Sequence, residues 1–183
     1  EPSAGRIVMN GVTVYDNGWT GIDVRAFRRR NIGFVFQQHN LIPFLTAQEN
    51  VALMMQLNGA SRRDAARRAQ GALADAATAA LDFIRTQMVV DGRLCATWKD
   101  GRARFNAYLD DHAYLLDAVL ELLQTRFSTA HLSYAIWLAD CLLAHFEDRD
   151  NGGFWFTSHD HEPLLHRPKP MTDDAMPSGN GIA

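Results

Sequence analysis

A long helical pattern in the middle of the chain most constrains how this sequence can fold. Apolar residues recur every three or four positions, at 66, 69, 73, 77, 80, 84 and 88, the spacing that keeps one face of an α-helix apolar. Ser61, followed three residues later by Asp64, is typical of a helix start. We therefore predict one helix from about residue 62 to 88, weakened only by Gly71, which costs about 1 kcal/mol relative to alanine.

The charge of the chain changes sign along this helix. Residues 1–70 contain nine arginines and five acidic residues, whereas residues 71–183 contain nine basic and sixteen acidic residues. Such an asymmetry suggests two parts of different origin. We place the junction within residues 72–76, so that a first part, 1–73, and a second, 74–183, are joined rigidly by the helix. The basic runs lack interleaved aromatic residues, so we expect no nucleic-acid partner.

Composition also bears on the compartment. No run approaches the roughly 18 apolar residues of a membrane helix, and the first residues lack the basic and apolar regions of a signal peptide. We expect a cytoplasmic chain without membrane insertion. Cys95 and Cys141 show no C-x-x-C spacing, so we interpret them as reduced, packed thiols.

Local signals in the first part predict a hairpin, a strand and a helix. Two alternating runs, 7–9 and 12–15, flank Asn10-Gly11, a dipeptide that favours tight hairpin turns. The apolar run 31–37, "NIGFVFQ", is typical of a buried strand. Thr46-Ala-Gln-Glu49 is a capping box, so a helix should run to about Leu57 and end at Asn58-Gly59.

This order of a strand ending in Gln37, the loop "QHNLIPFL" and the capped helix "TAQENVAL" resembles the ATP-binding subunit of ABC transporters, in particular the exporter and lipoprotein-release type. The resemblance covers about residues 1–73. It implies that Gln37 contacts magnesium and the attacking water, and that residues 40–45 couple to a membrane subunit of the transporter.

The 183 residues lack the phosphate-binding sequence that such an ATPase requires. A G-x-x-x-x-G-K-[ST] loop cradles the phosphates with backbone amides and places a lysine on them. The two lysines, Lys99 and Lys169, do not follow a glycine, and no LSGGQ-like signature occurs. We therefore expect no nucleotide cofactor and interpret Gln37 as vestigial.

Two helices are predicted in the second part. The first spans about 107–124, and the second runs from Ser128 or Thr129 to about Phe146, antiparallel to the first after a tight turn. On the helical wheel, Asp110 faces water, Asp111 lies on the boundary and His112 falls among apolar residues. The predicted buried side of the second helix is Leu132, Ile136, Ala139 and Leu143.

Residues from about 76 onward, with the motifs "LDDHAYLLDA", "NGGFWFT" and "RPKP…DDAMPSGN", resemble the YyaL-type group related to spermatogenesis-associated thioredoxin-domain proteins. Its (α/α)6 barrel is similar to that of N-acylglucosamine and cellobiose 2-epimerases. About four helices of a twelve-helix barrel are present. The resemblance implies that a boundary acid or an inward histidine exchanges a proton with a sugar. The alternative is an acid favoured by the helix dipole and a histidine packed in a core.

The candidate site lies at one end of the helical hairpin. The start of the first helix and the segment after the second should lie at the same end. Aromatic faces and charged hydrogen-bond partners hold sugars, so we take the aromatic and charged residues at this end as candidates. The predicted catalytic residues are Asp111, His112, His159 and His161, and the predicted substrate-binding residues are Arg102, Arg104, Trp155 and Arg167.

We expect no metal in this region. His161-Glu162-Pro-Leu-Leu-His166 is one residue longer than H-E-x-x-H, and Pro163 opposes the helix that would gather its ligands. "NGGFWFT" is interpreted as a turn and a short strand, with Phe154 and Phe156 on one face and Trp155 on the other.

Taken together, we expect a mostly α fold with a small β component, in which a partial α/β ATPase segment is joined by a long helix to helical hairpins of an incomplete (α/α)6 barrel. The predicted function is a catalytically incomplete composite without an ATP site. The alternative is a carbohydrate-binding or sugar-isomerising module, completed by self-association through exposed apolar edges.

Overall fold

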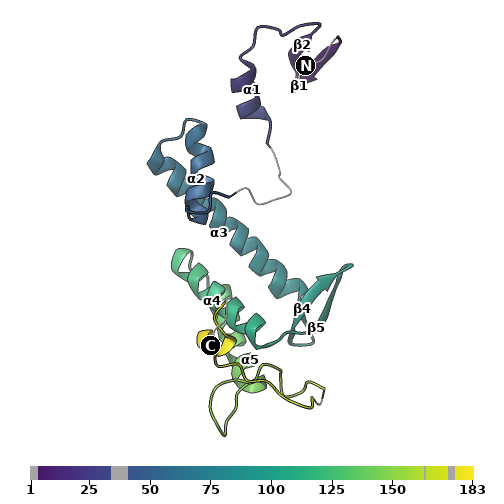
Figure 1. Cartoon of the computed structure of the whole chain (residues 1–183), viewed down its shortest axis with the longest axis vertical. Coiled ribbons are helices and arrows are strands. Elements are labelled where there is room, and N and C mark those ends of the chain that lie inside the picture. The colour runs from purple at the N-terminus through teal and green to yellow at the C-terminus, as the bar shows by residue number, and fades with distance from the viewer. Residues whose placement is uncertain (1–3, 34–40, 163, 173–175) are drawn as a thin grey trace. The chain divides into compact units, whose positions relative to one another are not determined.

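A computed structural model describes residues 4–33, 41–162, 164–172 and 176–183 (Figure 1). The chain divides into two compact units, Glu1–Gln70 and Gly71–Ala183. The division falls inside one helix, α3 (Arg62–Gln87), and about half of the described residues are helical.

In the first unit, the predicted hairpin is confirmed. Strands β1 (Arg6–Met9) and β2 (Val12–Asp16) pair antiparallel, with Met9 opposite Val12 and a register shift between Ile7 and Val8. Asn10 and Gly11 both have positive φ, 49° and 78°. Two such residues make the tight turn whose twist matches that of the flanking strands.

The hairpin is followed by a helix that the sequence analysis did not predict. Helix α1 (Val24–Asn31) begins at Asp23, whose side chain accepts a hydrogen bond from the Ala26 amide at 2.9 Å. The prediction of a strand from residue 31 is therefore wrong at its start, because Asn31 ends a helix and residues 32–33 are not strand. The remainder of that predicted strand, with Gln37, lies outside the described residues, as does Asn40.

Helix α2 (Ala47–Leu57) begins with the predicted capping box. The Thr46 hydroxyl accepts from the Glu49 amide at 3.2 Å, and the Glu49 carboxylate accepts from the Thr46 amide at 2.8 Å. Asn58 caps the other end, and Gly59 follows with φ of 93°. Small side chains form the core of this unit, where Ala52, Ala65 and Ala69 pack together.

Helix α3 is continuous, as predicted, and the Ser61 hydroxyl accepts from the Asp64 amide at its start. The predicted apolar face is only partly right. Ala65, Ala69, Ala74 and Leu81 are buried, whereas residues 77 and 80 are exposed. Because alanines occur on several sides of this helix, their spacing alone does not decide which side packs against neighbours.

After α3, the second unit continues with three strands. β3 (Val89–Val90), β4 (Arg93–Lys99) and β5 (Arg102–Asn106) pair antiparallel in that order. Both turns are aspartate-glycine pairs with positive φ, 49° and 75° at residues 91–92 and 53° and 73° at residues 100–101. These strands were not predicted from the sequence, although each Asp-Gly pair is a local signal for a hairpin.

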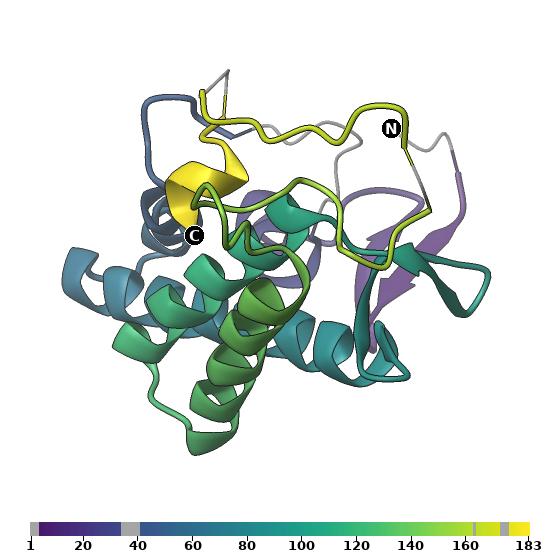
Figure 2. The ribbon, with the colours of Figure 1, turned by 90° about the horizontal axis from the view of Figure 1, so that it is seen from below.

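Helices α4 (Leu109–Thr125) and α5 (Thr129–His145) form the predicted antiparallel hairpin and lie side by side (Figure 2). The prediction for the buried face of α5 is wrong. Leu132, Ile136 and Leu143 are 40%, 55% and 48% exposed. The core instead receives His131, Tyr134, Ala135, Leu138, Cys141 and Leu142. This helix is apolar on almost every side, so apolar residues spaced three or four apart occur on two different faces.

A short helix, α6 (Gly179–Ile182), packs against α4. The Gly179 amide donates to the Asp110 carboxylate at 3.1 Å, and the Tyr114 hydroxyl donates to the Pro177 carbonyl at 2.5 Å. The prediction that Asp110 simply faces water is therefore wrong, because its carboxylate is half-buried against α6.

Candidate functional site

The start of α4 meets the segment 154–161, as the hairpin connectivity predicted. The Leu109 amide donates to the Phe156 carbonyl at 3.0 Å. The Tyr108 ring stacks on the Phe156 ring with 5.0 Å between centroids, and the His161 ring lies 6.2 Å from Tyr108. Phe154 and Phe156 both pack against the buried cluster of Leu109, Leu142 and Phe146, so they share a face as expected. The predicted short strand is wrong, because Phe154 forms only an isolated β-bridge with Glu147 and residues 155–157 are not strand.

Asp111 and His112 occupy the first turn of α4 in different environments. The Asp111 carboxylate accepts from the Tyr108 amide at 2.8 Å and is exposed. The His112 ring is 1% exposed, lies 5.0 Å from the Phe146 ring, and its Nδ1 is 2.9 Å from the Tyr108 carbonyl. Burial lowers the pKa of His112. This geometry is that of a capping acid beside a neutral, packed histidine.

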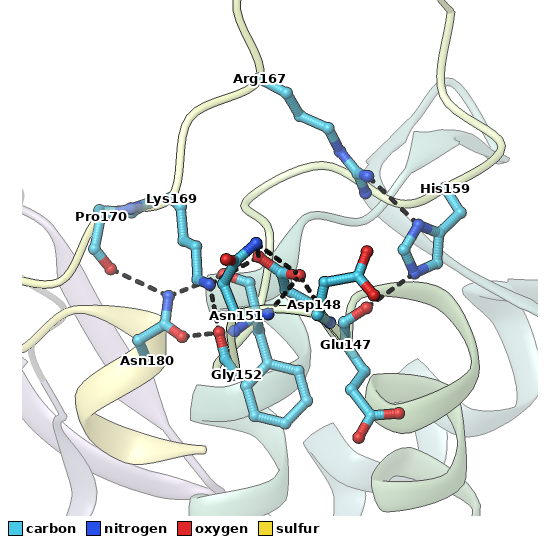
Figure 3. A network of polar contacts seen from close by, with 11 residues as sticks. Glu147, Asp148, Asn151, Gly152, His159, Arg167, Lys169, Pro170 and Asn180 are labelled. Carbon is cyan, nitrogen blue, oxygen red and sulfur yellow. Dashed lines mark hydrogen bonds and ion pairs between the residues drawn. The ribbon is translucent and has the colours of Figure 1, made fainter.

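His159 is held by both of its ring nitrogens (Figure 3). Nε2 lies 3.1 Å from the Glu147 carbonyl, and Nδ1 lies 3.2 Å from the guanidinium of Arg167. Because a guanidinium only donates, Nδ1 accepts, and Nε2 carries the proton that reaches the carbonyl. The His161 side chain, by contrast, hydrogen-bonds among the described residues only to the neighbouring Glu162 carbonyl, at 3.1 Å through Nδ1.

Two cations lie over the ring of Trp155. The Arg167 guanidinium is 5.1 Å and the Lys169 ammonium 5.3 Å from the ring centroid, within the range of cation–π attraction. Arg167 also donates to the Thr157 hydroxyl at 3.2 Å. The Trp155 ring is therefore already contacted by two cations of the chain itself.

Lys169 is fixed by a buried carboxylate (Figure 3). Its ammonium donates to Asp148 at 2.8 Å and to the Gly152 carbonyl. Asp148 is 6% exposed and also accepts from the amides of Asp150 and Asn151. The Lys169 ammonium, followed by these amides, lowers the pKa of Asp148 to about 2.

Asn180 joins three segments at the same place. Its side-chain oxygen accepts from the Phe154 amide at 2.7 Å, and its side-chain nitrogen donates to the Phe154 and Pro170 carbonyls, both at 2.9 Å. A pocket of about 460 Å³ opens beside this network. Among its lining residues are Glu147, Asp148, Trp155 and His159.

The remaining predicted substrate residues lie elsewhere. Arg102 and Arg104 are exposed on β5, and neither side chain bonds to another described residue. A basic residue that the sequence analysis missed, Arg93 on β4, instead forms an ion pair with Asp160. These two residues are 67 positions apart, and no local pattern marks such a pair.

Within the described ranges, no group of three or more histidine, cysteine, aspartate or glutamate side chains is placed to hold a metal ion. Cys95 and Cys141 are free and buried, and burial raises the pKa of both thiols. None of the described helices is long and apolar enough to cross a membrane.

Comparison with known proteins finds similarity over part of the chain. A lipoprotein-releasing system ATP-binding protein LolD from Syntrophus aciditrophicus is 39% identical over 74 residues, which are 40% of this chain and 32% of that protein. LolD from Bacteroides thetaiotaomicron is 42% identical over 74 residues, 40% of this chain and 33% of the relative. An uncharacterized ABC transporter ATP-binding protein from Mycobacterium tuberculosis is 44% identical over 66 residues, 36% of this chain and 26% of the relative.

The chain thus spans about a third of the length of the LolD proteins it matches. Part of the chain is similar to ABC transporter ATP-binding proteins, as the resemblance of its sequence motifs indicated. No protein-family model matches the chain, and no solved structure matches it.

Proposed function

We propose that this chain is a catalytically incomplete composite, in which residues 1–73 are an ABC-type ATP-binding segment and residues 74–183 a segment of a sugar-epimerase-like helical barrel. One observation carries the proposal. Similarity to ATP-binding proteins covers 40% of the chain, yet its 183 residues contain no G-x-x-x-x-G-K-[ST] sequence. Phosphoryl transfer depends on positioning and neutralising the phosphates, so these 183 residues do not by themselves hold ATP beside Gln37.

A membrane subunit is the proposed partner of the first segment. The proposal rests on the resemblance of residues 40–45 to a coupling loop. The described part of that loop supports it, because Leu41 and Phe44 are 61% and 86% exposed. Large apolar side chains this exposed are typical of a surface that another protein covers.

Binding of ATP to the full chain tests the first proposal. We expect isothermal titration calorimetry with magnesium and ATP to give no more heat than an unrelated protein of similar charge. A saturable, magnesium-dependent site in the micromolar range would refute it. The same titration with magnesium omitted separates nucleotide coordination from non-specific attraction to the basic residues.

The second candidate function is weak carbohydrate binding, with self-association completing the module. The pocket of about 460 Å³ beside Trp155 and His159 favours it, since sugar sites combine aromatic faces with polar groups. The engaged nitrogens of His159 and the cations over Trp155 argue that affinity is low without rearrangement. Titration with N-acetylglucosamine should shift NMR signals near these two residues. Shifts confined to residues 125–132 would contradict the assignment.

A further inference from the structure

The basic residues of the second unit divide into two groups. Six of its nine lysines and arginines have partners among the described residues. Five form the ion pairs Arg85–Asp82, Arg93–Asp160, Arg126–Asp75, Arg149–Glu147 and Lys169–Asp148, and Arg167 bonds to Thr157 and His159. The three that have no polar partner among these residues, Lys99, Arg102 and Arg104, all lie on the β4–β5 hairpin.

The register of the hairpin places these three cations on one face. Lys99 lies opposite Arg102, and Arg104 lies opposite Thr97, so all four side chains point to the same side of the ribbon. Like charges directly opposite each other destabilise a strand pair. Asp100 in the turn forms no ion pair with any of the three within the described part of the chain. The isolated unit therefore holds an unfavourable, exposed cationic face.

Helix α4 carries a matching anionic face. Asp117 and Glu121 are exposed and four residues apart, a spacing at which like charges destabilise a helix. Neither forms an ion pair with a described residue, and Glu121 receives only a hydrogen bond from Gln124 at 3.2 Å. Leu120, between them on the same face, is 46% exposed.

We propose that these two faces dock on each other between two copies of this chain. The hairpin face of Lys99, Arg102 and Arg104 would lie on the α4 face of Asp117, Leu120 and Glu121 of a second copy. Each face relieves the like-charge repulsion of the other, and the long aliphatic stems of lysine and arginine cover Leu120. Because every copy has both faces, a two-fold dimer forms the contact twice.

A second copy fits the cationic hairpin better than a nucleic acid does. The unit around the hairpin contains sixteen acidic and nine basic residues, so a polyanion is repelled by most of its surface. The proposed contact uses only residues of the second unit and is independent of the composite function proposed above.

Charge exchange in the full chain tests the dimer. Sedimentation equilibrium over a wide concentration range should show a monomer–dimer equilibrium that high salt weakens, because exposed charges are screened. Arg102→Glu with Arg104→Glu should weaken the dimer about ten-fold or more, and Asp117→Arg with Glu121→Arg should do the same. An equimolar mixture of the two double variants should form a heterodimer, and all four substitutions in one chain should restore self-association.

Arg62→Glu with Arg63→Glu is the matched control, because it makes the same charge change on exposed residues at the start of α3, and it should leave the dimer unchanged. Circular dichroism establishes that each variant is folded. A chain that stays monomeric at every concentration overturns the proposal. So does a dimer that ignores both double substitutions, or a monomeric chain whose hairpin cations bind a labelled oligonucleotide.

Discussion

Replacing Gly179 with alanine should destabilise the second unit, although alanine normally favours a helix over glycine. A Cβ at this position would lie 2.4 Å from an Asp110 carboxylate oxygen and 2.8 Å from Leu109 Cγ. Both distances are shorter than van der Waals contact, and Leu109 is fully buried. Extra volume in a packed site costs about 1 to 3 kcal/mol, which exceeds the gain of about 1 kcal/mol in helix propensity.

Gly71→Ala provides the matched control. Gly71 lies inside α3, and a Cβ there would meet no atom within 4 Å. That substitution should stabilise the chain by up to about 1 kcal/mol. The two glycine-to-alanine substitutions should therefore change the free energy of unfolding in opposite directions. An effect of alanine on the unfolded chain is common to both, so it cannot explain the opposite signs.

Urea denaturation followed by circular dichroism measures the two free energies of unfolding, and hydrogen exchange of residues 176–183 reports whether α6 stays docked. If the clash costs more than the docking of α6 contributes, Gly179→Ala should release this helix and its amides should lose protection. Asp110→Ala in the Gly179→Ala background should recover part of the loss. A Gly179→Ala chain as stable as the parent, with α6 still protected, would refute the packing argument.

Three further predictions concern caps and titrating groups. Thr46→Ala removes the α2 cap and should cost about 0.5 to 2 kcal/mol in urea denaturation, with a loss of helical signal. Asp148→Asn should lower the melting temperature at pH 7, because Lys169 holds the pKa of Asp148 at about 2. The stability that the charged Asp148 contributes is present above the ordinary carboxyl range and is lost as pH falls through about 2, so the difference in melting temperature from the parent should shrink in acid. The control, Asp150→Asn, should change the melting temperature little. Burial lowers the pKa of His112, so the folded state should lose stability as pH falls below about 6.5, where the unfolded chain takes up the proton. In melting curves, His112→Gln should flatten this dependence of the melting temperature on pH.

Local signals in the sequence predicted some of the elements that local chemistry decides. The Asn10-Gly11 turn and the Thr46 capping box each act within four residues, so they could be identified without knowing the fold. The buried face of α5 could not, because Ile136 and Leu138 are both apolar and only packing against the rest of the second unit selects between their sides. Which side of an apolar helix is buried is a tertiary property.

The same distinction applies to the candidate site. The connectivity of a helical hairpin was enough to predict that the start of α4 meets the segment after α5. It was not enough to predict that His159 is held between Glu147 and Arg167, or that Lys169 lies over Trp155. These contacts depend on the path of the irregular segment after α5, and no periodic pattern in the sequence predicts that path.

The three Asx-Gly turns have a consequence for the order of folding. Each described strand pairs with a neighbour across a two-residue turn at residues 10–11, 91–92 or 100–101. Such hairpins form in about 1–10 μs and place no demand on distant parts of the chain. The contacts that span long sequence separations instead join these elements to distant segments, as between Arg93 of β4 and Asp160 and between Asn180 of α6 and Phe154. We therefore expect the hairpins to form before these contacts between distant parts of the chain, because closing long loops slows folding.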